Sequence, residues 1–243
     1  MSKFGLIGRN IGYSFSKNFF SEKFENENLF HSYENFDIPS IELFPKIISE
    51  NPNLKGLNVT IPYKEEVIKF LNSLDATAQK IGAVNTIKIS ETGKLTGFNT
   101  DFYGFQKSLE NFLPLKKKTA LILGTGGASK AIAYALKNLD FEFKFVSRTE
   151  NSNTINYESV NKSIIENHLL IVNCTPLGTF PNIHEYPAIP YGFLTENHLL
   201  FDLIYNPAET EFLKQGKTNG AKTANGLRML ELQAEKAWKI WNS

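Results

Sequence analysis

The stretch LILGTGGASKA, residues 121–131, constrains the fold of this chain more than any other segment. An apolar run ends at Gly124, and apolar residues with helical spacing begin near Ala128. A strand that enters a helix through a glycine turn is typical of a dinucleotide-binding unit. Gly124 would make the tight turn and Gly126 would let the backbone approach a pyrophosphate, while Ser129 stands where the fingerprint has its third glycine. A tight turn that only packs a strand on a helix has the same pattern, so both interpretations are open at this point.

The rest of the chain alternates short apolar runs with stretches of helical spacing. This order predicts an α/β fold with parallel sheets and helices on both sides. The rhythm restarts after Pro114, so we expect two α/β domains with a cleft between them. Expected strands cover residues 4–7, 30–36, 54–61, 119–123, 141–146, 169–172 and 199–203, and a hairpin joins 83–89 to 95–99. Expected helices follow Ser14, Ile41, Pro62, Asp75, Asp101, Ala128 and Val160, with two more ending at Thr218 and near the C-terminus.

Composition excludes several classes of protein. Lys and Arg number 26 against 25 Asp and Glu, which leaves no basic excess for a nucleic acid or an anionic membrane. No segment approaches the ~20 apolar residues of a membrane span. The single cysteine, Cys174, excludes an internal disulfide and fits a cytoplasmic location, and the scattered histidines show no metal-ligand spacing. We therefore expect a cytoplasmic protein without a metal, whose partners are small molecules.

An arginine follows the next expected strand, in the segment Ser147-Arg148-Thr149. An acidic residue there would bind the ribose hydroxyls of NAD, whereas Arg148 suits the 2′-phosphate of NADP. Surface arginines after strands are common, so this residue supports NADP only together with the glycine turn.

Short motifs in a fixed order run through nearly the whole chain, and on them it resembles the shikimate dehydrogenase family. The motifs occupy residues 14–16, 58–64, 82–86, 99–101, 124–128, 147–149, 173–178, 202–207 and 225–234. The resemblance implies an NADP-dependent oxidoreductase that reversibly reduces 3-dehydroshikimate to shikimate with NADPH, in chorismate and aromatic amino acid biosynthesis. It also implies a substrate-binding domain, residues 1–101 with about 224–243, and a Rossmann-like NADP-binding domain, residues 102–223.

The resemblance assigns roles residue by residue. Substrate binding is assigned to Ser14, Ser16, Asn58, Thr60, Lys64, Asn85, Asp101, Tyr205 and Gln233. Cofactor binding is assigned to Gly124, Gly126, Gly127, Ala128, Ser147, Arg148, Thr149, Asn173, Thr175, Leu203, Gly226 and Met229. Simpler interpretations exist: the two serines are good helix caps, a helical glutamine is usually solvated, and a methionine is more often a core residue.

Lys64 and Asp101 are the candidates for moving the proton when a ketone is reduced. With Pro62 as first helical residue, Lys64 would lie in the first turn, where the helix dipole disfavours its positive charge. Asp101 would orient the amine and favour that charge, so the two effects oppose each other. The simpler interpretation is a solvated lysine and an aspartate that caps the next helix.

The chain departs from the family pattern at several positions. Tyr13 and Lys17 stand where histidine and proline are usual, residues 150–153 lack a second basic side chain, and Arg228 replaces a small residue near the expected nicotinamide. Two alternatives therefore stay open: a quinate/shikimate dehydrogenase with relaxed use of NAD and NADP, and a dinucleotide-binding sensor without catalysis. The sequence is compatible with a monomer or a homodimer.

Overall fold

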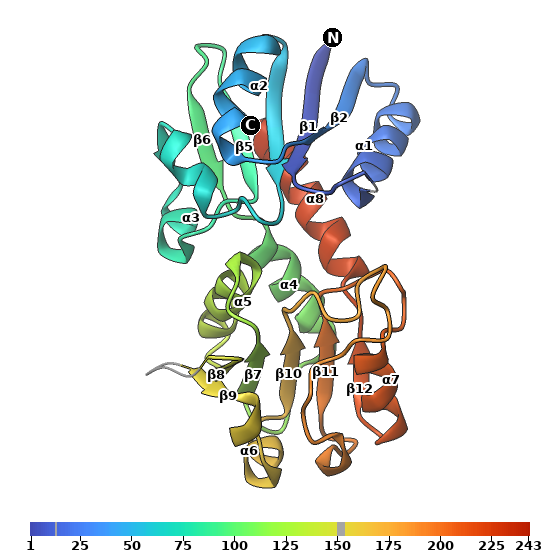
Figure 1. Ribbon diagram of the computed structural model, residues 1–243. Coiled ribbons are helices and arrows are strands. Elements are labelled where there is room, and N and C mark those ends of the chain that lie inside the picture. Colours follow the sequence, from blue (N-terminus) through green and yellow to red (C-terminus); the bar gives the residue numbers. More distant parts are fainter. Residues whose placement is uncertain (13, 150–153) are drawn as a thin grey trace. The chain divides into compact units, whose positions relative to one another are not determined.

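The computed structural model describes residues 1–12, 14–149 and 154–243 (Figure 1). Its contacts divide the chain into unit 1, Met1–Tyr103 with Gln233–Ser243, and unit 2, Gly104–Leu232. Each unit contains one six-stranded sheet within the described residues. The predicted α/β class with two domains is confirmed. We predicted that the chain returns to the first domain at about residue 224. By their contacts, residues 227–232 of the last helix, α8 (Leu227–Trp241), belong to unit 2.

The sheet of unit 1 has the strand order β2-β1-β3-β5-β6-β4. Strand β1 runs parallel to β2 and β3, but β5 runs antiparallel to both β3 and β6. The sheet of unit 1 is therefore mixed. Parallel pairing holds for β1 with β2 and β3, as predicted, but not for β3 with β5, and the antiparallel pair of β5 and β6 is the hairpin predicted for residues 83–99. The physical reason is the short connection between β5 and β6, which turns the chain back on itself, whereas parallel neighbours need a long crossover. The strands are β1 (Ser2–Gly8), β2 (His31–Asp37), β3 (Leu54–Val59), β4 (Ser73–Leu74), β5 (Thr86–Ile89) and β6 (Leu95–Phe98).

Helices of unit 1 begin largely where the sequence predicted. The Ser14 hydroxyl accepts a hydrogen bond from the Lys17 backbone N–H (3.3 Å), and Asp75 caps the helix that follows it. The predicted helix that starts at Pro62 is wrong. The Tyr63 N–H donates to the Thr60 carbonyl (2.9 Å) and closes a turn around Pro62, and a five-residue 3-10 helix starts only after it. The helices are α1 (Phe15–Asn26), η1 (Ile41–Leu43), α2 (Phe44–Glu50), η2 (Glu66–Phe70), α3 (Ala76–Ile81) and α4 (Asp101–Leu109), of which α4 continues into unit 2.

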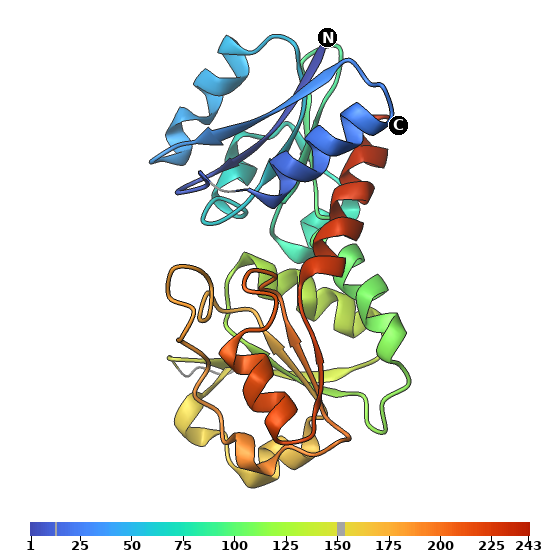
Figure 2. The same cartoon turned by 90° about the vertical axis from the view of Figure 1, so that its right-hand side faces the viewer.

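Both faces of this sheet are covered (Figure 2). Phe4 of β1 packs with the aromatic residues of α1 and the end of α8, whereas Ile7 packs in the cluster that includes α2 and η2. This alternation is what an extended strand requires when both faces are buried. The end of α8 is anchored by Trp241, whose indole N–H donates to the Ile87 carbonyl (3.0 Å). A Cβ on Gly56 would lie 2.3 Å from that indole nitrogen, so only glycine leaves room for it.

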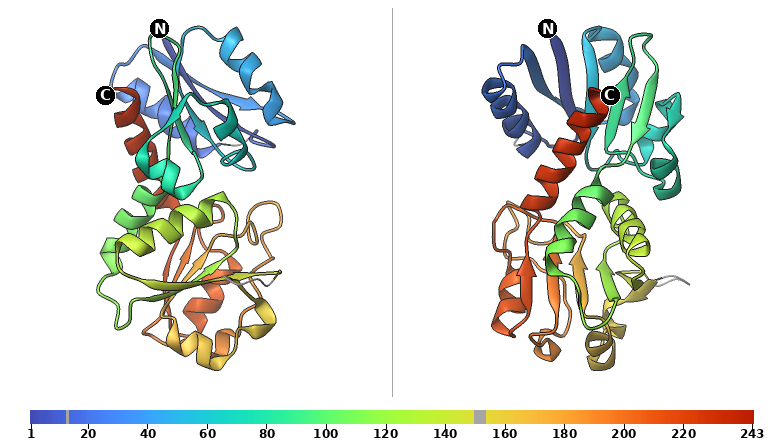
Figure 3. Two further views of the ribbon diagram at one scale, coloured as in Figure 1. Left: turned by 90° about the vertical axis from the view of Figure 1, so that its left-hand side faces the viewer. Right: turned by 180° about the vertical axis from the view of Figure 1, so that it is seen from behind.

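The sheet of unit 2 is parallel throughout, in the order β12-β11-β10-β7-β8-β9 (Figure 3), as predicted. Its central strands β7 and β10 are almost wholly buried, which explains why they read as continuous apolar runs. The strands are β7 (Thr119–Leu123), β8 (Glu142–Ser147), β9 (Thr154–Asn156), β10 (Leu170–Asn173), β11 (Leu199–Asp202) and β12 (Lys222–Ala224). The helices are η3 (Glu110–Phe112), α5 (Gly127–Asn138), η4 (Tyr157–Ser159), α6 (Lys162–Asn167), η5 (Tyr191–Phe193), α7 (Glu211–Thr218) and the start of α8. Across the described part of the chain, every helix is too short or too polar to cross a membrane.

Candidate functional site

The topology of unit 1 brings polar residues from distant parts of the chain to one edge of its sheet. Parallel strands β1 and β3 end at this edge, and Ser14 and Thr60 follow those ends. Strand β5 is antiparallel to β3 and therefore starts there, just after Asn85, while β6 ends there shortly before Asp101. The fold thus collects the predicted substrate residues of this unit at a single edge.

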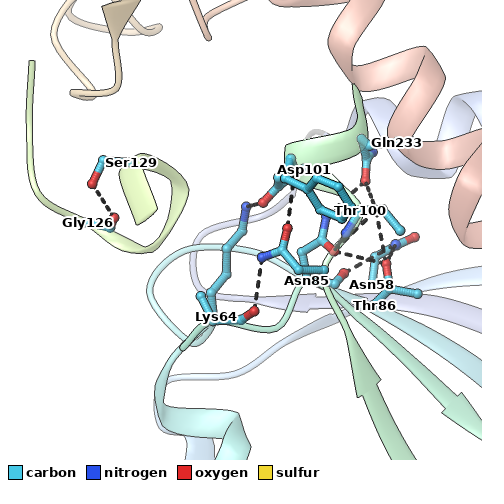
Figure 4. Close-up of polar contacts among 12 residues, drawn as sticks. Asn58, Lys64, Asn85, Thr86, Thr100, Asp101, Gly126, Ser129 and Gln233 are labelled. Atoms are coloured by element: carbon cyan, nitrogen blue, oxygen red, sulfur yellow. Dashed lines mark hydrogen bonds and ion pairs between the residues drawn. The ribbon is translucent and has the colours of Figure 1, made fainter. Parts of the chain in front are cut away.

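Lys64 and Asp101 form an ion pair at this edge (Figure 4). Lys64 Nζ lies 2.7 Å from Asp101 Oδ2, and the two side chains are 14% and 7% exposed. The helix-cap interpretation of Asp101 fails, because Asn99 Oδ1 accepts the Phe102 N–H of that helix (3.3 Å). Lys64 is also not in the first turn of a helix, where it was predicted, because it lies in the turn before η2, so no helix dipole acts on its charge there. The simpler interpretation of a solvated lysine does not fit either, since the amine is largely buried against a carboxylate.

Asn85 is the centre of the hydrogen bonds around this pair (Figure 4). Its Nδ2 donates to Asp101 Oδ1 (2.9 Å) and to Gln233 Oε1 (3.2 Å). Its Oδ1 accepts the backbone N–H of Thr100 (2.6 Å). Gln233 also accepts from the Thr100 hydroxyl (3.2 Å) and is buried, so it is not the solvated glutamine of the simpler interpretation. The carboxylate of Asp101 is therefore held on one oxygen by an amine and on the other by an amide.

Tyr33 belongs to the site and was not predicted. Its hydroxyl donates to Asn58 Oδ1 (2.8 Å) and also bonds to Ser16. Burial raises the pKa of Tyr33, an effect that the hydrogen bond with Ser16 partly offsets, so the hydroxyl stays protonated and able to donate. Asn58 donates in turn to the Asn85 carbonyl (3.4 Å), which links the strands β2, β3 and β5. No sequence signal marks Tyr33, because the residues around it have the pattern of an ordinary strand at the edge of a sheet.

Two further predicted substrate residues, Thr60 and Tyr205, are described by their place in the chain. Thr60 follows β3, with its methyl against Gly8, where a Cβ would lie 2.5 Å away. The strand predicted for residues 54–61 ends at Val59, and Ile61 beyond it is 66% exposed. Tyr205 lies in unit 2, unlike the other predicted substrate residues.

The glycine turn of unit 2 leads from β7 into α5. Gly124 has a φ of +102°, a conformation that favours glycine, and a Cβ there would lie 3.2 Å from the Thr175 methyl. Gly126 precedes the helix with open space where a Cβ would be, and Gly127 and Ala128 begin α5. Ser129, in the third position, is buried and donates to the Gly126 carbonyl (2.6 Å; Figure 4). The serine thus satisfies its buried hydroxyl within the turn.

Arg148 stands in an exposed turn at the end of β8. The Ser147 hydroxyl accepts the Thr149 N–H (3.1 Å) and donates to the Thr149 carbonyl (3.0 Å). The Thr154 hydroxyl donates to the same carbonyl (3.1 Å). Arg148 therefore projects from a braced turn rather than from a free loop end.

The ends of β10 and β11 share a buried polar network. Asp202 accepts from Asn173 Nδ2 and from the Thr210 hydroxyl, and Asn173 Oδ1 accepts from the Thr175 hydroxyl (2.6 Å). Burial raises the pKa of Asp202 to about 6, although bonds from Thr210, the Ile204 N–H and Asn173 work against the rise. Cys174, between the two predicted cofactor residues, has its N–H bonded to the Leu123 carbonyl (2.9 Å) and is partly buried.

The start of α8 packs tightly on the loop after β11. Gly226 donates its N–H to the Ile204 carbonyl (3.0 Å), and a Cβ on Gly226 would lie 2.1 Å from the Leu203 carbonyl oxygen. Met229, one turn further, is buried. All predicted cofactor residues thus lie at the carboxyl ends of the parallel strands or after them, where dinucleotides bind in sheets of this kind.

A cavity of about 420 Å³ also opens in unit 2, beside α4 and the end of β12. Its lining includes Phe112, Phe201 and Arg228 but none of the predicted site residues. Arg228 pairs with Glu231 on its own helix (3.0 Å). This cavity is therefore distinct from the predicted cofactor residues.

Metal ligands are not clustered in the described ranges, where no group of three or more His, Cys, Asp or Glu side chains could hold an ion. Tyr13 and residues 150–153, two of the departures from the family pattern, lie outside the described residues.

Comparisons with known proteins agree with this arrangement. Residues 6–87 match the family model described as the shikimate dehydrogenase substrate binding domain. The chain is 40% identical to the shikimate dehydrogenase (NADP(+)) of Clostridium botulinum over 98% of its own length and 95% of the relative's. Shikimate dehydrogenase 1 from Peptoclostridium difficile superposes with a TM-score of 0.88 at 38% identity, over 100% of this chain and 92% of that one. The shikimate 5-dehydrogenase of Thermus thermophilus, solved with NADP(H) and shikimate, gives a TM-score of 0.88 at 33% identity, over 99% and 93%. The chain therefore belongs to the shikimate dehydrogenase family.

Proposed function

We propose that this protein is an NADP-dependent shikimate dehydrogenase, which interconverts 3-dehydroshikimate and shikimate in aromatic amino acid biosynthesis. The observation that carries the proposal is the Lys64–Asp101 pair, 2.7 Å apart and largely buried, at the edge where the amides of unit 1 converge. A binding protein without catalysis has no need of a buried amine beside a carboxylate, which argues against the sensor alternative.

The proton half of the reaction falls to Lys64. Reduction of a ketone places a hydride on carbon and a proton on oxygen, and the protonated amine supplies that proton. Asp101 holds Nζ in place, and Asn85 fixes the other carboxylate oxygen (2.9 Å), so the amine is oriented by residues at the start of α4 and just before β5. In the reverse direction the neutral amine accepts the proton from the hydroxyl of shikimate.

The residues of unit 2 fit a phosphorylated dinucleotide. Gly126 leaves open space before α5, whose N-terminal N–H groups suit a pyrophosphate, and Arg148 and Thr149 suit the 2′-phosphate. Asn173 and Thr175 would face the ribose or pyrophosphate, and Leu203, Gly226 and Met229 the nicotinamide. When bound, NADP supplies or accepts the hydride.

Substrate recognition is assigned to hydrogen-bonding groups, in keeping with a ligand that carries one carboxylate and three hydroxyls. Ser14 and Ser16 at the start of α1 are proposed to bind the carboxylate, since a helix N-terminus favours an anion. Thr60, Asn85 and Gln233 are proposed to bind hydroxyls, together with Tyr205. Asn58 supports them, because Tyr33 already occupies its Oδ1.

The test is an optical assay of NADPH formation from shikimate and NADP⁺, with quinate and NAD⁺ in the other pairings. We expect shikimate with NADP⁺ to give the highest kcat/KM. Comparable turnover of quinate with NAD⁺ would favour the quinate/shikimate dehydrogenase alternative. Absence of turnover with every pairing would contradict the enzymatic proposal.

A cytoplasmic location is proposed on the single cysteine and on the reducing environment that it suits. Both a monomer and a homodimer are compatible with the chain, and light scattering on the purified protein distinguishes them.

A further inference from the structure

Asp202 is a fully buried carboxylate at the end of β11 that the proposed reaction does not use. Its Oδ1 accepts from Asn173 Nδ2 (3.0 Å) and from the Ile204 N–H (3.0 Å). Its Oδ2 accepts from the Thr210 hydroxyl (2.6 Å). Both oxygens are therefore engaged, and one of them faces the side-chain amide at the end of β10.

This contact determines which way the Asn173 amide points. A carboxylate only accepts hydrogen bonds, so it selects the NH₂ group of Asn173 and turns the carbonyl Oδ1 the other way. That oxygen accepts both the Thr175 N–H (3.0 Å) and the Thr175 hydroxyl (2.6 Å). A flipped amide would set oxygen against carboxylate at one end and NH₂ against N–H at the other, so the orientation is fixed from both sides.

The turn that Asn173 holds is next to the glycine turn of β7. The Thr175 hydroxyl accepts the Leu177 N–H (3.3 Å), and the Thr175 methyl is the atom nearest to a Cβ placed on Gly124. The Cys174 N–H is bonded to the Leu123 carbonyl (2.9 Å). The residues that follow β10 thus pack directly against the glycine turn at Gly124.

We propose that Asp202 is a positioning residue for the cofactor, acting through the orientation of Asn173 on the turn that holds Thr175. The inference rests on the proposed function, in which this turn contacts the dinucleotide. A residue needed only for packing would not be a buried acid, because removing a carboxylate from water is costly and a neutral side chain fills the same space. The raised pKa of Asp202, about 6, reflects that cost.

Three variants separate positioning from simple stabilisation. Asp202→Ala removes the acceptor for Asn173, whereas Asp202→Asn keeps an Oδ1 for Asn173 and for the Ile204 N–H. Thr210→Val removes a donor from the same network without touching Asn173. The readouts are the Kd for NADPH by fluorescence, the KM for shikimate and the thermal midpoint.

We expect Asp202→Ala to raise the Kd for NADPH about tenfold with little change in the KM for shikimate, and Asp202→Asn to restore affinity to within about threefold of wild type. Thr210→Val should lower the thermal midpoint and leave the Kd within about threefold. If Asp202→Ala does not fold, Asp202→Ser, which keeps a hydroxyl for Thr210, takes its place in the comparison.

A double variant tests whether Asp202 and Asn173 act on the cofactor together. Asn173→Ala combined with Asp202→Ala should raise the Kd no more than the larger single effect, because both act on one turn. Wild-type affinity in Asp202→Ala, or a loss in Thr210→Val equal to that in Asp202→Ala, would overturn the inference. Failure of the wild-type protein to bind NADPH would instead contradict the proposed function.

Discussion

At the level of single residues, the two cations with proposed roles, Lys64 in unit 1 and Arg148 in unit 2, are held in different ways. Lys64 is fixed through its main chain as well as its charge, because its carbonyl accepts the Val84 N–H (2.7 Å) and its amine meets Asp101. Arg148 is exposed, in a turn that the Ser147 side chain braces. Lys64 therefore acts through its position, and Arg148 through the charge that it offers to a phosphate.

This difference predicts the effect of Arg148→Ala. Loss of a charge-assisted bond to the 2′-phosphate should raise the KM for NADP⁺ by about tenfold or more, and leave the KM for NAD⁺ within about twofold. Steady-state kinetics with both cofactors measures the effect. Lys144→Ala, which removes an exposed cation from β8, the strand that Arg148 follows, is the control and should change neither KM. Equal effects of Arg148→Ala on both cofactors would refute the phosphate role.

At the level of elements, two glycines mark strand-to-helix connections of unit 2 for different physical reasons. Gly126 has ordinary backbone angles and open space around its missing side chain. Gly226 has no space at all, since the Leu203 carbonyl oxygen would lie 2.1 Å from a Cβ. The first glycine leaves room for a ligand, and the second leaves room for the protein itself.

Alanine at these two positions should separate binding from stability. Gly126→Ala should cost under about 1 kcal/mol of stability, because alanine is the poorer N-cap, but should raise the Kd for NADPH at least tenfold. Gly226→Ala should lose about 3 kcal/mol by overpacking. Urea unfolding and NADPH fluorescence measure the two effects. An unstable Gly126→Ala that still binds NADPH normally would reverse this assignment.

Secondary structure was predictable where elements are long and apolar. The buried strands of unit 2 and the helices α1 and α5 follow from apolar runs and from spacing. The strands β4, β9 and β12 were missed, because they have only two or three residues and form through pairing with a neighbour. The helix expected at Pro62 was wrong, since a hydrogen-bonded turn occupies that place.

Site residues were predictable by side-chain chemistry and family resemblance, but not their connections. Lys64, Asp101 and Asn85 are brought together as the resemblance implied. Tyr33 could not be found, because only strand register brings it beside Asn58. Those residues pair with Phe4 and Leu6, two positions apart on the strand β1 that separates them.

At the level of the whole molecule, the proposed roles follow the two units. All proposed cofactor residues lie in unit 2, and all proposed substrate residues except Tyr205 lie in unit 1. Stability of the cofactor unit should carry its own pH dependence through Asp202, whose pKa of about 6 in the folded protein exceeds its ordinary value of 3.8. The folded unit therefore holds this proton more tightly than the unfolded chain does.

The sign of the effect follows from that difference. Below about pH 4 Asp202 is protonated in both the folded and the unfolded state, so it does not lower the free energy of unfolding. Between about pH 4 and 6 Asp202 ionises in the unfolded chain first, so the folded state loses stability as the pH rises. The loss amounts to roughly 3 kcal/mol above pH 6. We predict that the stability gained by Asp202→Asn over wild type grows by about this amount from about pH 4 to pH 7, measured by urea unfolding. Asp140→Asn, which changes an exposed carboxylate of the same unit, should show no such gain.

The central claim is that Lys64 moves the proton in an NADP-linked oxidation of shikimate. It is tested most directly by kcat for NADPH formation from shikimate and NADP⁺ in wild type and Lys64→Met, with the Kd for NADPH measured alongside. Lys69→Met, which removes an exposed lysine paired with Glu42, is the matched control. We predict that Lys64→Met lowers kcat about a thousandfold with the Kd for NADPH unchanged, and that Lys69→Met keeps wild-type turnover. A kcat of Lys64→Met within about tenfold of wild type would contradict the account.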